Sequence, residues 1–185
     1  RSRSATVCGW SLGGQLAMRW ALSRPAQIER LVLIASTPRF VQGPGWDSGM
    51  EPAVFDAFAH DLAHDAGGVL QRFVVLQAHG DAHSRSVSRR LRECTAGQGK
   101  TDAAALAAGL QILKDTDLRS DLPRITQPVL IVHGERDTVV PPAAGVYLKH
   151  TLQRAKLEVI AGAAHAPFIG RAQDAARRIA EFCHG

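Results

Sequence analysis

The heptapeptide CGWSLGG, at residues 8–14, places Ser11 between two glycines in the pattern G-x-S-x-G. Gly9 precedes the serine by two residues and Gly13 follows it by two. An apolar stretch lies before this pattern and a helix-forming stretch after it. In that context such a serine lies on a sharp strand-to-helix turn with its hydroxyl exposed. The pattern therefore predicts a nucleophilic serine.

A serine hydroxyl is a good nucleophile only when a base removes its proton, and a carboxylate must orient that base. Asp137 follows the apolar run VLIVHG, and His165 follows the apolar run LEVIAG. The chain order serine, aspartate, histidine is the order expected for an α/β hydrolase. We therefore predict a triad of Ser11, Asp137 and His165, with Glu135 as the reserve candidate for the acid.

The other histidines and aspartates favour structural roles. His133 lies within an apolar strand and is expected to pack there, and three aspartates before that strand (115, 117 and 121) favour surface capping. No pair among the remaining histidines has a convincing metal-site context, so no metal is predicted. These histidines are His60, His64, His79, His83, His150 and His184.

A tetrahedral intermediate also needs hydrogen-bond donors for its oxyanion. The backbone N–H of Leu12 follows the predicted nucleophile at a helix N-terminus, where the helix dipole favours negative charge. A second donor is expected from a loop after an earlier strand, upstream of Arg1.

The segments that would position these residues alternate between strand and helix patterns. Short apolar runs predict buried strands at 5–10, 30–36, 127–134 and 155–162. Helical spacing predicts helices at 13–25, 142–152 and 171–184. This alternation is typical of an α/β fold with a parallel sheet and right-handed crossovers.

Between residues 38 and 122 the pattern changes, because apolar residues there recur only at helical spacing. We predict a helical cap inserted into an α/β core, which comprises residues 1–37 and 123–185. A chain of 185 residues suits one domain of this kind.

Composition narrows the class of protein further. The chain has no apolar run of the ~18 residues that a membrane span requires, and no visible secretory leader. Three cysteines without metal-ligand spacing favour a reducing compartment, so a cytoplasmic location is expected. The first residue is arginine, which indicates that the natural N-terminus lies elsewhere.

The chain has a net charge of +5, and several of its arginines are close together in the sequence. One short stretch contains Arg85, Arg89, Arg90 and Arg92, and Arg72 lies just upstream. These arginines form either a solvated helix face or a docking patch for an acidic partner. Nucleic acid is disfavoured, since no aromatic residues interleave and no nucleic-acid module is recognisable.

Six segments together resemble the pimeloyl-[acyl-carrier-protein] methyl ester esterases of biotin synthesis, which are α/β hydrolases with a helical cap. The segments are CGWSLGG, LVLIASTPRF, QRFVVLQ, LQILKDTDLR, GERDTVVP and GAAHAPF. The resemblance covers essentially the whole chain. It implies hydrolysis of the methyl ester of pimeloyl-acyl carrier protein through an acyl-serine, with no cofactor. A monomer is expected.

Carried over residue by residue, the resemblance implies the same triad of Ser11, Asp137 and His165. Leu12 resembles the family position that donates to the oxyanion and contacts the substrate. It also implies that the cap residues from Phe73 to Gln77 line the acyl channel. The cap residues Arg72, Arg85 and Arg89 would meet the acidic carrier protein. One departure is Gly68, which stands where a further cap arginine is expected.

A second departure is that members of this family are longer at the N-terminus. The chain is therefore expected to be a C-terminal portion, poorly active alone, with the apolar strand at 5–10 left as an open sheet edge. Two alternatives remain open at this point. One is a general short-chain carboxylesterase or another small-molecule hydrolase on the same fold, and the other is a truncated, catalytically impaired fragment.

Overall fold

The computed structural model describes residues 4–95 and 102–185. Within these ranges, one parallel sheet has the strand order β1-β2-β3-β4, which is also the order in the sequence. The predicted α/β fold with a parallel sheet is confirmed. The strands are β1 (Ala5–Trp10), β2 (Ile28–Ile34), β3 (Val129–Gly134) and β4 (Ala155–Ile160).

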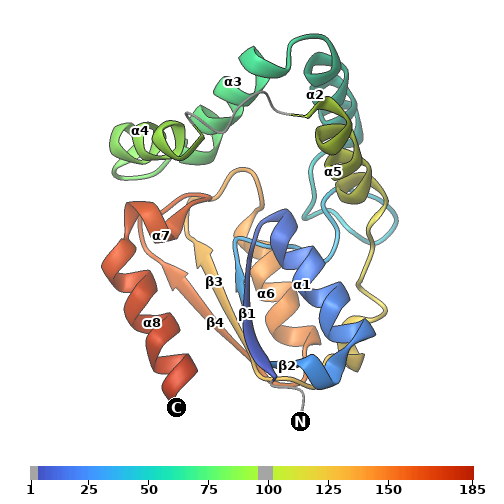
Figure 1. Cartoon of the computed structure of the whole chain (residues 1–185), viewed down its shortest axis with the longest axis vertical. Helices are drawn as coiled ribbons and strands as arrows, with labels where there is room; N and C mark the ends of the chain where they lie inside the picture. Colours follow the sequence, from blue (N-terminus) through green and yellow to red (C-terminus); the bar gives the residue numbers. More distant parts are fainter. Residues whose placement is uncertain (1–3, 96–101) are drawn as a thin grey trace.

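Helices cover both faces of the sheet, as Figure 1 shows. Side chains alternate between the two faces along a strand. Leu31 and Leu33 accordingly pack with α1 (Leu12–Ser23) and α6 (Pro142–Thr151), whereas Val32 and Ile34 pack on the side of α8 (Ala172–His184). The sheet is thus the middle of three layers with an apolar core on each face.

The observed boundaries differ from the predicted ones for local reasons. α1 ends at Ser23, two residues before Pro25, because proline disfavours helical backbone in the residue before it. A short 3₁₀ turn, η1 (Pro25–Gln27), leads directly into β2. That strand ends at Ile34, since Ala35 has a φ of 46° and cannot continue an extended chain.

Between β2 and β3 lie the helices α2 (Pro52–His64), α3 (Ala66–Ala78), α4 (Ser84–Thr95) and α5 (Ala103–Asp115). They fall inside the predicted insertion and lie above the carboxyl ends of the strands (Figure 1). That this insertion forms a separate cap domain stays a prediction. The exit segment includes a 3₁₀ turn, η2 (Leu122–Arg124), whose Leu122 belongs to the core beneath α1 and α6.

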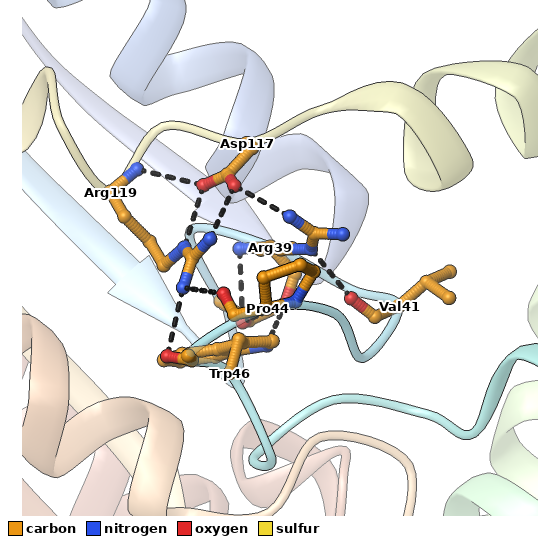
Figure 2. A network of polar contacts seen from close by, with 8 residues as sticks. Arg39, Val41, Pro44, Trp46, Asp117 and Arg119 are labelled. Atoms are coloured by element: carbon orange, nitrogen blue, oxygen red, sulfur yellow. Dashed lines mark hydrogen bonds and ion pairs between the residues drawn. The ribbon is translucent and has the colours of Figure 1, made fainter.

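A network of arginines and one aspartate joins the two ends of this insertion (Figure 2). Asp117, on the exit side, accepts from Arg39 on the entry side at 2.7 Å and from two guanidinium nitrogens of Arg119 at 2.7 and 2.9 Å. Arg119 also donates to the carbonyls of Pro44 and Gly45. Two guanidinium groups hold one carboxylate, which is the strong, charge-assisted form of hydrogen bonding.

The backbone reinforces this connection, because Leu118 N–H donates to Pro38 C=O at 3.0 Å. The sequence indicated only surface capping for Asp117. The structure adds a tie between two segments far apart in the chain, so the entry and exit segments of the insertion are held together at its base.

Two further features frame the site. β1 lies at the edge of the sheet, and β2 is its one neighbouring strand among the described residues. A four-residue helix, α7 (Pro167–Gly170), was not predicted and follows β4 closely.

Across residues 4–95 and 102–185, none of the helices has the length and hydrophobicity to cross a membrane.

Candidate active site

Ser11 occupies the turn between β1 and α1 in a strained backbone conformation, with φ 54° and ψ −120°. Its N–H donates to the carbonyl of Ile34 at 2.9 Å, which ties the turn to the end of β2. Non-glycine residues held at positive φ store strain and concentrate at functional sites. This conformation is the one expected of a serine held on a strand-to-helix turn.

Close packing around this turn explains two of the glycines. A Cβ on Gly9 would lie 2.7 Å from the Cα of Gly14, and a Cβ on Gly14 would lie 2.5 Å from the Cβ of Ser36. At Gly13, by contrast, a Cβ would meet no atom within 4 Å. Gly9 and Gly14 therefore allow β1, α1 and the end of β2 to approach each other.

Asp137 and His165 are in direct contact at the carboxyl ends of β3 and β4. Asp137 Oδ2 lies 2.8 Å from His165 Nδ1, and both side chains are buried. The other oxygen, Oδ1, accepts from the N–H groups of Val139 and Val140 at 2.9 Å each. The carboxylate is thus held from both sides in the orientation that the imidazole requires.

This contact settles which nitrogen of His165 is available. When Nδ1 donates its proton to the carboxylate, Nε2 of the neutral ring carries a lone pair. His165 Nε2 is buried and has no hydrogen-bond partner among the described residues. A buried acceptor without a partner is costly, and one explanation is a catalytic role.

The loop that carries His165 is attached to β1 and to α3. Trp10, the residue before Ser11, donates from its indole N–H to the carbonyl of His165 at 2.9 Å, and the two rings lie 5.6 Å apart. His165 N–H donates to the carbonyl of Gln77 at 3.2 Å. The turn of Ser11 and the His165 loop are therefore neighbours.

The reserve acid and the packed histidine lie in different surroundings. Glu135 accepts from the N–H of Gly162 at 2.9 Å, whereas the hydrogen bond to His165 Nδ1 is made by Asp137, so the geometry favours Asp137 as the acid. His133 is fully buried in β3, as predicted from its apolar strand. The sequence did not indicate that its Nε2 also lies 3.5 Å from Asp137 Oδ2. The one sequence feature that could have indicated this contact is that His133 and Asp137 are four residues apart, across the carboxyl end of β3.

Leu12 is the first residue of α1, so its N–H belongs to the first-turn donors that a helix leaves unbonded. α5 lies above it, because a Cβ built on Gly109 would be 3.6 Å from Leu12 Cδ2. The predicted oxyanion donor therefore sits beneath a helix of the insertion.

The two predicted channel residues lie one turn apart on α3. Gln77 is buried beside the His165 loop, and Phe73 is half-buried with its ring centroid 5.4 Å from that of Phe58. Phe73 also lines a mainly apolar pocket of about 300 Å³ between α2 and α3, with Arg72 among the other lining residues. Their role in binding an acyl chain stays a prediction.

The predicted docking arginines lie on two helices of the insertion and are exposed to solvent. Arg72 on α3 is 65% exposed at its side chain and Arg89 on α4 is 77% exposed, and Arg85 is exposed on the same helix. Gly68, the departure noted above, donates its N–H to Asp65 Oδ1 at 2.9 Å and so completes the N-terminal cap of α3.

Among residues 4–95 and 102–185 there is no group of three or more histidine, cysteine, aspartate or glutamate side chains arranged to hold a metal ion.

Comparison with known proteins agrees with this architecture. The sequence model of the α/β hydrolase fold matches residues 2–172. An esterase from Exiguobacterium antarcticum superposes with a TM-score of 0.89 at 24% identity, over 99% of this chain and 68% of that one. An enol-lactonase from Burkholderia xenovorans superposes with a TM-score of 0.81 at 23% identity, over 100% and 67%. Fold and site together define an α/β hydrolase.

Two curated relatives narrow the class. The pimeloyl-[acyl-carrier protein] methyl ester esterase of Stenotrophomonas maltophilia is 41% identical over 181 residues, which cover 98% of this chain and 70% of the relative. The protein of the same name from Nitrosomonas europaea is 42% identical over 164 residues, covering 89% and 65%. The chain belongs to the family of pimeloyl-[acyl-carrier protein] methyl ester esterases.

Proposed function

We propose that this chain supplies the catalytic residues of a serine esterase that hydrolyses the methyl ester of pimeloyl-acyl carrier protein in biotin synthesis. The membership of the esterase family supports the substrate. The observation that carries the chemistry is the buried pair of Asp137 and His165, in which Nε2 of the imidazole is left without a partner beside the turn of Ser11.

In the proposed mechanism, His165 Nε2 takes the proton of Ser11 as the hydroxyl oxygen attacks the ester carbonyl carbon. Asp137 stabilises the imidazolium that forms, and the N–H of Leu12 donates to the oxyanion. The proton passes from His165 to the leaving methoxide, and methanol departs. Water, activated by the same imidazole, then attacks the pimeloyl-serine ester and releases the carboxylic acid and Ser11.

The surface of the insertion supports a carrier-protein partner. On α3, the apolar residues Val75 and Leu76 are 47% and 39% exposed, close in sequence to Arg72. Arg85 and Arg89 on the adjoining α4 extend the positive charge. Exposed apolar side chains with positive charge around them suit an acidic protein surface, because charge complementarity guides the encounter and fixes its orientation. The monomeric state and the cytoplasmic location stay predictions.

The test compares hydrolysis of pimeloyl methyl ester when free and when attached to acyl carrier protein, using the whole protein and Ser11→Ala. We expect strong preference for the carrier-bound ester. Ser11→Ala should lower kcat by about 10⁶-fold, as loss of a serine nucleophile does elsewhere, with an unchanged circular dichroism spectrum. Full activity of Ser11→Ala would contradict the proposed mechanism. Equal cleavage of free short esters would instead indicate a general carboxylesterase.

Arg89→Glu separates docking from chemistry. It should raise KM for the carrier-bound ester and make this KM less sensitive to salt, while kinetics on the free ester stay unchanged. Arg124→Glu is the matched control, since its side chain is 68% exposed and also pairs with an acidic neighbour, but lies on η2 outside the predicted docking surface. Equal effects of both substitutions would argue against a docking role for α4.

A further inference from the structure

A second imidazole faces the carboxylate of Asp137. His133 is fully buried near the carboxyl end of β3, and its Nε2 lies 2.9 Å from the carbonyl oxygen of Val140 and 3.5 Å from Asp137 Oδ2. His165 Nδ1 contacts the same carboxylate oxygen at 2.8 Å. Asp137 Oδ2 is therefore flanked by two imidazoles, only one of which the proposed mechanism uses.

The surroundings determine where His133 carries its proton. A carbonyl oxygen can only accept, so Nε2 must be the donor in the contact with Val140. Nδ1 is buried without a hydrogen-bond partner among the described residues, and α6 packs against it closely enough that a Cβ on Gly145 would lie 2.8 Å away. The ring is thus a neutral Nε2–H tautomer with its proton on the side of Asp137.

Neutrality is consistent with the burial of this ring. Desolvation lowers the pKa of His133, and the hydrogen bond to the Val140 carbonyl and the nearby charge of Asp137 only partly oppose that effect. The titratable groups that act on His133 are Asp137 and His165. A neutral N–H contributes a dipole beside Asp137 without adding a positive charge that would compete with the imidazolium of His165.

We propose that His133 is a positioning residue for the triad acid, whose Nε2–H, anchored on the carbonyl of Val140, holds the 137–140 loop and faces Asp137 Oδ2. Val140 is the link, because its carbonyl accepts from His133 while its N–H donates to Asp137 Oδ1 at 2.9 Å. One residue is thereby fixed at both ends, and the carboxylate with it. The catalytic consequence rests on the proposed function.

The test compares His133→Leu with His133→Gln in the whole protein. Leucine fills the apolar site but has no donor, whereas glutamine keeps an N–H. We expect His133→Leu to lower kcat by about 10- to 100-fold, the range for slightly misplaced catalytic groups, with little change in KM. Its acid limb of kcat/KM should move to higher pH, because Asp137 Oδ2 loses one favourable dipole and interacts more strongly with the His165 imidazolium. His133→Gln should restore most of both values.

Ile131→Val is the matched control, since it trims a buried side chain two residues away on the same face of β3 and removes no polar group. It should lower stability by about 0.5–1.5 kcal/mol and leave kcat and the acid limb unchanged. Wild-type kinetics in a folded His133→Leu protein would overturn the proposal. Equal losses in the leucine and glutamine variants would also overturn it, because packing alone would then explain them.

A spectroscopic readout keeps the proposal separate from the proposed esterase activity. The proton between His165 Nδ1 and Asp137 Oδ2 should give a low-field ¹H NMR resonance that shifts in His133→Leu and returns in His133→Gln. If the protein proves inactive on every ester, the proposed function fails, yet this resonance still tests His133. An unshifted resonance in His133→Leu would overturn the positioning role.

Discussion

At the scale of single residues, the glycine motif and the packing that it serves do not coincide fully. The pattern G-x-S-x-G singles out Gly9 and Gly13, whereas the tight contacts are made by Gly9 and Gly14. Gly14 packs against Ser36, which comes from the end of another strand. No pattern within the heptapeptide could reveal that neighbour, because it depends on how two distant segments meet.

A pair of neighbouring substitutions tests this difference. Gly14→Ala should lower the free energy of unfolding by about 1–3 kcal/mol, the usual cost of overpacking, because its Cβ would overlap Ser36. Gly13→Ala, with open space at the same turn, should change it little. Urea unfolding of both variants gives the measurement. Restored stability in Gly14→Ala combined with Ser36→Gly would confirm the contact as the cause.

At the scale of elements, the ends of the predicted strands were the sequence features that located the candidate site residues. The positions of Ser11, Asp137 and His165 followed from apolar runs that end at loops, because parallel strands bring their carboxyl ends to one edge of the sheet. The sequence did not predict the contacts of His133 or the tie between Arg39 and Asp117. Each joins side chains by tertiary packing, and neither shows in local periodicity.

α5 offers a test of how the insertion meets the site. Gly109→Leu should fill the space above Leu12 and raise KM for the ester about tenfold, a loss of roughly 1.4 kcal/mol of binding. Gly67→Leu on α3 is the matched control, because a Cβ there also meets no clashing atom but lies away from Leu12. Both changes should improve helix propensity similarly. Equal KM values in the two variants would show that α5 does not border the substrate.

At the scale of the whole molecule, the lowered pKa values of His133 and Asp117 predict that the fold loses stability in two separate ranges of acidic pH. His133 has a lowered pKa in the fold, so only the unfolded chain binds its proton readily, and stability should fall as pH drops below about 6.5. Arginine hydrogen bonds hold the pKa of Asp117 well below 3.8. Its contribution is therefore complete above pH 3.8 and declines below that value.

Urea unfolding at successive pH values measures both effects. His133→Gln should remove the decline in the higher range and leave the lower one, and Asp117→Asn should do the reverse. A decline near neutral pH that persists in His133→Gln would assign it to another histidine.

The direct pairing of β2 with β3 has a consequence for how the chain folds. All of the insertion lies between Ile34 and Val129, so these strands can meet only after a long loop closes. The β1–β2 and β3–β4 pairs are linked by much shorter segments, and we expect each to form early as a separate βαβ unit. Joining them at the central seam is then the slow step. Because closure entropy grows only with the logarithm of loop length, halving the insertion would ease that step by only about 0.6 kcal/mol.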